Sequence, residues 1–302
     1  MLPRVIGGMI AMSGALACAA DWPTPDPDAP VPTAKPGTAL FHAQMCAQYL
    51  GPIPRASCSD AHVVPVTVDG VEVAWTKNRP SRPFEQPEAC DVPDALSGTC
   101  QQGNGVARYP GTHHDGSSRE EVTYLAFCRD GGLGLIGYNR TTGATCFFHM
   151  SHNVANTATH PGSNDPDYEA YWQVPAIVAK DQCQGCHQAD PFIHSPWVDQ
   201  LKDPDNPKEP LVPIIAGPAN PRPPYYVLGV EFSQPVSAEL PNNVCTTCHR
   251  PSCDNRFTMP LGDLHMPPPF KDYHRTDIWA EDRNALREWC DQAANGGVGK
   301  NP

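Results

Sequence analysis

Charged residues are scarce in this chain of 302 residues: they make up 18% of it, and 33 Asp and Glu outnumber 21 Lys and Arg. The formal net charge of -12 leaves no basic surface to hold phosphate groups, so nucleic-acid binding is excluded. Apolar runs are also short, and only the N-terminus comes near the roughly 18 to 20 residues that a membrane-spanning helix needs. Cysteine, proline and glycine are abundant instead, at 13, 36 and 24 residues. Together with 40% hydrophobic residues, this composition indicates a loop-rich globular protein of one or two domains.

The N-terminus has the pattern of an export signal. Residues 1–17 contain a cationic start and an apolar core, and small residues then lead to Cys18. Gly14–Cys18 resembles the lipobox of bacterial lipoproteins, which implies a lipid anchor at Cys18. Cleavage by ordinary signal peptidase is the alternative. Residues 18–38 are rich in proline and predict an extended tether after the anchor.

Two CxxCH pentapeptides stand in the second half of the chain, Cys183-Gln184-Gly185-Cys186-His187 and Cys245-Thr246-Thr247-Cys248-His249. In such a motif two thiols on one turn add to the vinyl groups of a haem, and the adjacent imidazole binds the iron. The motifs therefore predict two c-type haems. A shared zinc site would leave both histidines unexplained, and a thioredoxin-like disulfide would need a βαβ setting that neither motif has. The attachment residues are Cys183, Cys186, Cys245 and Cys248, and the proximal ligands are His187 and His249.

Eight cysteines remain once the haem thiols and Cys18 are set aside: Cys46, Cys58, Cys90, Cys100, Cys128, Cys146, Cys253 and Cys290. The even number predicts up to four disulfide bonds. Disulfides and covalently attached haem both belong outside the cytoplasm. The expected location is a bacterial periplasm or cell surface.

The pattern of elements predicts an α+β fold in two domains. Residues 39–176 form a disulfide-rich, mostly β domain, and residues 177–302 form a small, loop-rich, helical dihaem cytochrome c domain. Strand-like runs lie at Val63–Val73, Val122–Cys128, Leu133–Tyr138 and Ala144–Phe148. The last two predict a hairpin whose turn uses a positive φ at Gly143. Cys128 and Cys146 then lie on neighbouring strands that a disulfide could join.

Short helices are expected before each motif, over 176–183 after Pro175 and over 242–245 after Pro241. The strongest helical pattern is at the C-terminus, where apolar residues recur at helical spacing before a Gly-Gly stop: Trp279, Leu286, Trp289, Cys290 and Ala293.

The second CxxCH, the following Met266-Pro267-Pro268 and the final helix together resemble class I cytochrome c over about residues 241–294. The resemblance implies that Met266 is the distal ligand opposite His249. It also implies that the last helix packs on the motif helix, which would bring Cys290 to Cys253 for a disulfide bond. Because Met266 follows His249 closely, other assignments stay open. In one alternative Met266 is the distal ligand of the first haem, and Met259 or His265 binds the iron of the second. In another, Met266 is a core residue.

The distal ligand of the first haem has several candidates. His194 is favoured because Pro191 and Pro196 would stiffen its loop beside the haem edge. The segment 147–152 offers His149, Met150 and His152 as alternatives. His113-His114-Asp115 looks like a metal cluster, but its Gly and Ser neighbours favour a polar loop.

These features favour a membrane-tethered dihaem electron carrier rather than an enzyme. Its acidic surface would suit redox partner proteins with a basic docking face. One alternative is an enzyme resembling the bacterial dihaem cytochrome c peroxidases, although those split their motifs between two halves of the chain. The other is a surface binding or sensing protein in which residues 39–176 recognise a target and the haems report on it.

We expect the mature chain to begin at a lipid-modified Cys18, because small residues and a Pro-rich segment flank it. Mass spectrometry of the membrane-extracted protein checks this, and Cys18→Ser should release the protein from the membrane fraction. An unmodified N-terminus at Cys18 or beyond would contradict the expectation.

Overall fold

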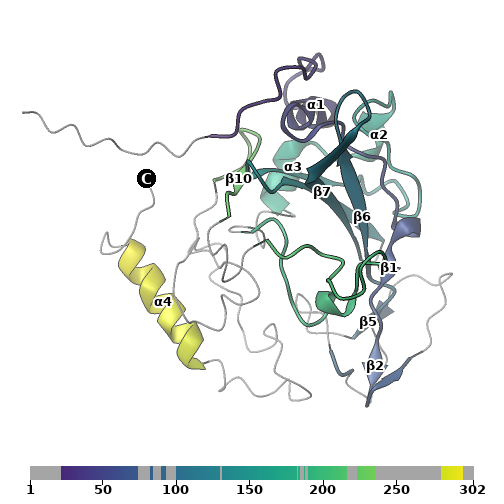
Figure 1. Ribbon diagram of the computed structural model, residues 1–302, viewed down its shortest axis with the longest axis vertical. Helices are drawn as coiled ribbons and strands as arrows, with labels where there is room; N and C mark the ends of the chain where they lie inside the picture. Colours follow the sequence, from purple (N-terminus) through teal and green to yellow (C-terminus); the bar gives the residue numbers. More distant parts are fainter. Residues whose placement is uncertain are drawn as a thin grey trace, which may run out of the picture.

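The computed structural model describes residues 22–73, 82–83, 90–92, 100–129, 131–181, 183, 187, 190–215, 223–234 and 280–294. Its centre is a sheet of six strands in the order β1-β6-β7-β8-β9-β10 (Figure 1). The strands are β1 (His62–Val63), β6 (Gly105–Thr112), β7 (Ser118–Arg129), β8 (Gly132–Asn139), β9 (Ala144–His149) and β10 (Tyr226–Val227). All neighbours are antiparallel except β9 and β10, which run parallel.

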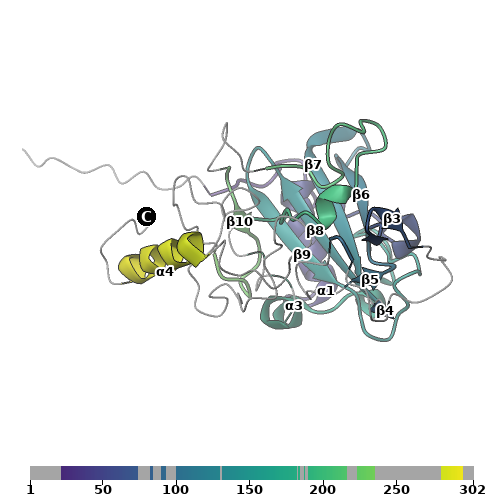
Figure 2. The ribbon, with the colours of Figure 1, turned by 90° about the horizontal axis from the view of Figure 1, so that it is seen from below.

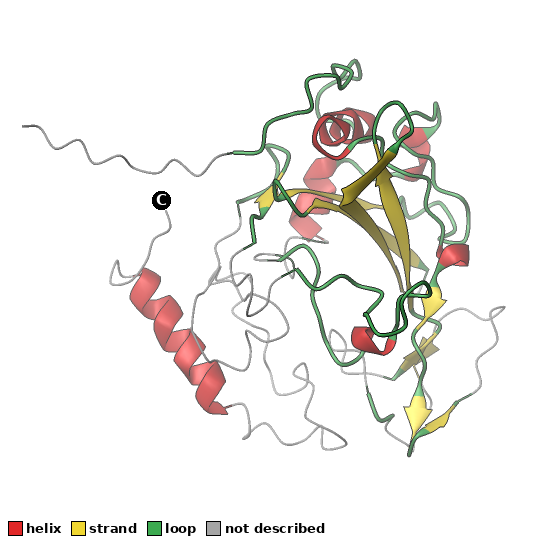
Figure 3. Ribbon diagram, in the orientation of Figure 1, coloured by secondary structure: helices red, strands yellow, loops and turns green. Residues whose placement is uncertain are grey.

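Two small sheets and a few helices complete the described fold (Figure 3). The small sheets pair β2 (Thr67–Val68) with β3 (Val71–Glu72), and β4 (Arg82–Pro83) with β5 (Gln101–Gln102). The helices are α1 (Ala39–Leu50), α2 (Tyr168–Tyr171), α3 (Pro175–Asp181) and α4 (Ala280–Ala294), with short 3-10 turns η1 (Cys58–Asp60) and η2 (Val198–Gln200). Within the described ranges, none of the helices has the length and apolar character needed to cross a membrane. The expected mostly β, disulfide-rich part is confirmed.

Alternation along the long strands buries both faces of the sheet. Successive side chains of a strand point to opposite faces, so one strand can feed two cores. The first core contains Val122, Tyr124, Ala126, Leu133, Leu135, Ala144, Cys146 and Phe148. The second contains Leu125, Ile136, Tyr138 and Phe147, with Phe127 packed against it. Each face therefore needs its own cover of helices or loops.

Helix α1 covers the first face. Thr38 caps its start by accepting a hydrogen bond from the Phe41 N–H. The carboxylate of Glu169, in α2, accepts the N–H groups of Ala39 and Leu40 at 3.2 and 3.0 Å. A carboxylate in this position also complements the positive end of the helix dipole. The helix ends at Leu50, and the next residue, Gly51, has a φ of 76° and lies so close to Thr112 that no side chain would fit.

Helix α3, β10 and the loops of 190–215 and 223–234 cover the second face (Figure 2). Their buried side chains are Val178, Cys183, Phe192, Trp197, Val198, Leu201, Leu211, Val212, Tyr225, Val227 and Phe232. The described residues on both sides of position 176 thus contribute to one core with the sheet. The domain boundary at 176/177 stays a prediction.

The Pro-rich segment before α1 lies along that helix. The Asp26 N–H donates to the Gln48 carbonyl at 2.7 Å, and the N–H groups of Thr33 and Ala34 donate to the Gln44 side chain. At its start, the Trp22 ring lies 5.4 Å from that of Tyr226. From Trp22 onward, this part of the expected tether is held against the folded protein.

The hairpin prediction is confirmed: β8 and β9 pair across a turn in which Gly143 has a φ of 79°. The strand at Val122–Cys128 and the C-terminal helix are also confirmed. The prediction of a single strand over Val63–Val73 is wrong, because the chain reverses direction at Asp69-Gly70. Both residues have positive φ and form a tight turn between β2 and β3. Strand β6 and helix α1 were missed.

Three disulfide bonds join Cys46 to Cys146, Cys58 to Cys128, and Cys90 to Cys100. The six spare cysteines of 39–176 thus pair among themselves. The suggested bridge between Cys128 and Cys146 is wrong, since β8 lies between their strands. Cys290 is also disulfide-bonded. Its expected partner Cys253 lies outside the described residues, so that pairing stays a prediction.

We expect the Cys46–Cys146 bond to contribute most to stability, because it closes a loop of 100 residues and ties α1 to β9. On the chain-entropy model, replacing both cysteines with Ala should lower the free energy of unfolding by about 4 to 5 kcal/mol. The matched control is the double replacement of Cys90 and Cys100, which are 10 residues apart, for which the same model gives about 3 kcal/mol. Urea unfolding of the three proteins measures the difference. Equal losses would contradict the loop-length argument.

Candidate functional site

Helix α3 carries the first CxxCH motif to the second face of the sheet. It begins at Pro175, as the sequence predicts, and ends at Asp181, two residues before Cys183. Val178 on its inner side is buried, and the helix packs beside β9. The N–H of His187 donates to the carbonyl of Cys183 at 3.0 Å. This bond holds the backbone of His187 close to that of Cys183, the first cysteine of the motif.

Aromatic rings lie around His187. The His187 ring lies 5.8 Å from that of Phe147 and 6.4 Å from that of Phe127, while the Tyr225 hydroxyl donates to the His187 carbonyl. Cys183 belongs to the same core and is 8% exposed. The first cysteine and the histidine of the motif thus lie on an apolar, aromatic surface, which is the kind of surroundings that a c-type haem requires.

The remaining residues of the predicted haem sites lie outside the described residues. These are Cys186 of the first motif and Cys245, Cys248, His249, Met259, His265 and Met266 around the second. Their assignments stay predictions.

His194 is buried near the second core, with both ring nitrogens engaged. Nδ1 lies 2.7 Å from a carboxylate oxygen of Asp199, and Nε2 donates to the Pro213 carbonyl at 3.1 Å. Burial alone would lower the pKa of His194, but the hydrogen bond and charge of Asp199 outweigh burial, and the pKa is raised above 6.5. A role as iron ligand would require these hydrogen bonds to rearrange.

A second cluster of chemically active side chains lies on the first face. His42, Cys46 and Cys146 place their ligand atoms within 4.8 Å of one another, and all three are buried. The two sulfurs form a disulfide bond, so they are not available to a metal. The His42 Nε2 donates to the Phe147 carbonyl at 3.2 Å, and burial lowers the pKa of His42 to about 4. The sequence signal for this contact was the spacing of His42 and Cys46, one turn apart on a helix that we did not predict.

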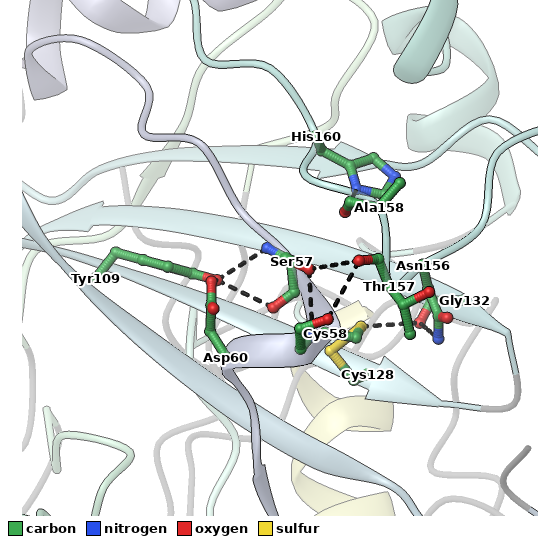
Figure 4. The surroundings of a disulfide bond; sticks show 11 residues. Ser57, Cys58, Asp60, Tyr109, Cys128, Gly132, Asn156, Thr157, Ala158 and His160 are labelled. Carbon is green, nitrogen blue, oxygen red and sulfur yellow. Dashed lines mark hydrogen bonds between the residues drawn. A yellow bond between two sulfur atoms is a disulfide. The ribbon is translucent and has the colours of Figure 1, made fainter. Parts of the chain in front are cut away.

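A polar network surrounds the Cys58–Cys128 bond (Figure 4). The Tyr109 hydroxyl accepts from the Ser57 N–H at 3.0 Å and lies 2.9 Å from a carboxylate oxygen of Asp60. Ser57 in turn donates from Oγ to the Thr157 carbonyl at 3.0 Å. Burial and Asp60 raise the pKa of Tyr109, so its hydroxyl stays protonated. The network anchors the loop after β9 to the sheet.

Comparison of the chain with protein-family models, with curated proteins and with solved structures found no match. The functional argument therefore depends on the motifs and on the geometry described above.

We expect His42 to make the protein less stable in acid. The folded-state pKa of His42 is about 4, below the usual 6.5. The stability that neutral His42 gives to the folded state is therefore complete above pH 6.5 and is lost as the pH falls toward 4. The loss by pH 4 should be on the order of 3 kcal/mol. His42→Gln keeps a donor for the Phe147 carbonyl without titrating, so it should flatten the pH dependence of the unfolding free energy. His62→Gln, at an exposed position, is the control and should leave the slope unchanged.

Proposed function

We propose that this protein is an exported, membrane-tethered dihaem c-type cytochrome that carries single electrons. The observation that carries the proposal is the first CxxCH motif, in which the His187 N–H donates to the Cys183 carbonyl and the His187 ring lies against Phe127 and Phe147 of the sheet. The repetition of the motif at 245–249 supports a second haem.

In this proposal Cys183 and Cys186 hold the first haem by thioether bonds, and His187 is its proximal ligand. The bound haem would supply a reversible one-electron couple at iron. Phe127 and Phe147 would keep water from the His187 side. The bond from Tyr225 to the His187 carbonyl would hold the His187 backbone in place, so that the imidazole needs little reorganisation between oxidation states.

The disulfide pattern supports export. None of the three bonds within 39–176 uses a cysteine of either CxxCH motif. Stable disulfides form in oxidising compartments, where c-type haem is also attached. The proposed location is the periplasm or the cell surface, with a lipid anchor at Cys18.

The charge of the chain supports an electron-transfer partner of opposite charge. With a formal net charge of -12, the protein would attract a basic docking face over long range and release it quickly after transfer. Such encounter complexes bury little surface and weaken with salt.

The purified mature protein should contain two covalently bound haems, measured by intact mass and by haem absorbance per polypeptide. Replacing Cys183 and Cys186 together with Ala should remove one haem, and replacing Cys245 and Cys248 should remove the other. The double replacement of Cys90 and Cys100 is the control and should leave both haems in place. Both haems should be reduced and reoxidised reversibly, without turnover of peroxide. A protein that holds zinc and no haem, or that consumes peroxide at enzymatic rates, would overturn the proposal.

A further inference from the structure

Three positions in register on the central strands lie near His187 of the first motif. Phe127 on β7 pairs with Gly134 on β8, and Gly134 pairs with His149 on β9. Directly paired residues of a sheet share a face. His149 therefore lies on the same face as Phe127 and as Phe147, which precedes it by two residues on β9.

Gly134 leaves space in the middle of this row. Among the residues that the structure describes, a Cβ atom there would meet only His149, at 3.9 Å, and the Phe148 carbonyl, at 4.0 Å. Phe127, Phe147 and His149 thus border a position on the sheet that holds no side chain. The His187 ring contacts two of these three neighbours, Phe127 and Phe147.

The imidazole of His149 is oriented like that of a metal ligand. Its Nδ1 donates to the carbonyl of Met150 at 3.0 Å, which leaves the lone pair on Nε2. A backbone carbonyl on one ring nitrogen commonly fixes the tautomer of histidines that bind metal through the other. Nε2 lies beside Gly132: a Cβ atom added to this glycine would be 4.0 Å from it.

The backbone of His149 is held as firmly as its ring. Its carbonyl accepts the N–H of Gln173 at 2.9 Å, and Met150 forms a bridge with Trp172. Helix α3 starts two residues after Gln173, so the segment that leads to Cys183 and His187 starts from the end of β9 that carries His149. One short piece of structure thus connects the motif to this histidine.

We propose that His149 is the distal iron ligand of the haem bound at Cys183, Cys186 and His187. This inference depends on the proposed function. It selects His149 from the candidates of the sequence over His194, whose two nitrogens are already bonded to Asp199 and Pro213. It also leaves Met266 to the second haem.

The test uses the purified holoprotein and compares His149→Ala with the matched control His152→Ala. His152 is an exposed histidine whose ring lies 6.4 Å from that of His149. His149→Ala should leave one of the two haems five-coordinate, seen as a high-spin ferric spectrum and as about one equivalent of bound carbon monoxide. His152→Ala should bind no more carbon monoxide than the parent. If His149→Ala keeps the ligand-binding and spin state of the parent, or if both variants change alike, the inference is overturned.

A second substitution distinguishes ligation from a structural role. His149→Met should keep the first haem six-coordinate, add a sulfur-to-iron absorption band and raise the potential of one haem, because methionine ligation favours the reduced state. A residue that only supported the fold would give none of these changes. The absence of a new sulfur band in a folded His149→Met protein with two haems would also overturn the inference.

The two proposals fail in different ways. Intact mass counts the attached haems before any spectrum is compared. Without covalent haem the proposed function itself is wrong. With two haems and an unchanged His149→Ala spectrum, only the assignment of His149 is wrong.

Discussion

The burial of β7, β8 and β9 on both faces is the constraint on which the rest of the structure depends. Side chains of one strand alternate between two cores. A shift of one residue in register would therefore move every side chain of that strand to the opposite core, where the covering helix or loops are not shaped to pack against it. Tyr124 and Leu125 illustrate this constraint, because they are adjacent in the sequence and fully buried on opposite faces of the sheet. The cover on each side must therefore be in place for the sheet to be stable.

The two covers are secured by different chemistry. On the first face, disulfide bonds fasten α1 to β9 and η1 to β7, and the Glu169 carboxylate holds the start of α1. On the second face, the described cover is attached mainly by apolar and aromatic contacts and by the parallel pairing of β10 with β9. Strand β9 belongs to both, because Cys146 and Phe147 are successive residues. In the proposed cytochrome, a rigid crosslinked side would thus support the side on which haem is attached.

Local signals explain what the sequence could predict. The hairpin follows from two alternating runs and a glycine suited to the turn, and α3 follows from Pro175 at a helix start. Strand β6 was missed because Pro110 and two glycines interrupt its pattern; the proline is tolerated since β1 pairs with β6 only at Gly105 and Val106. The disulfide pairing could not be predicted from the sequence. Cys46 comes close to Cys146 only because α1 packs on the sheet and because the strands have this order, and the sequence predicts neither. Of the two ring partners of His194, Asp199 is only five residues away in η2, whereas the Pro213 carbonyl is brought to the ring by the folding of the loop.

The docking of the Pro-rich segment on α1 affects how the molecule would sit at a bilayer. Asp26, Thr33 and Ala34 are hydrogen-bonded to that helix. If Cys18 carries a lipid, only the residues between Cys18 and Trp22 would separate the lipid from the folded protein. Four residues reach at most about 14 Å when fully extended. A lipidated protein would therefore stay close to the membrane, with Trp22 and the neighbouring edge at β10 as its nearest described parts.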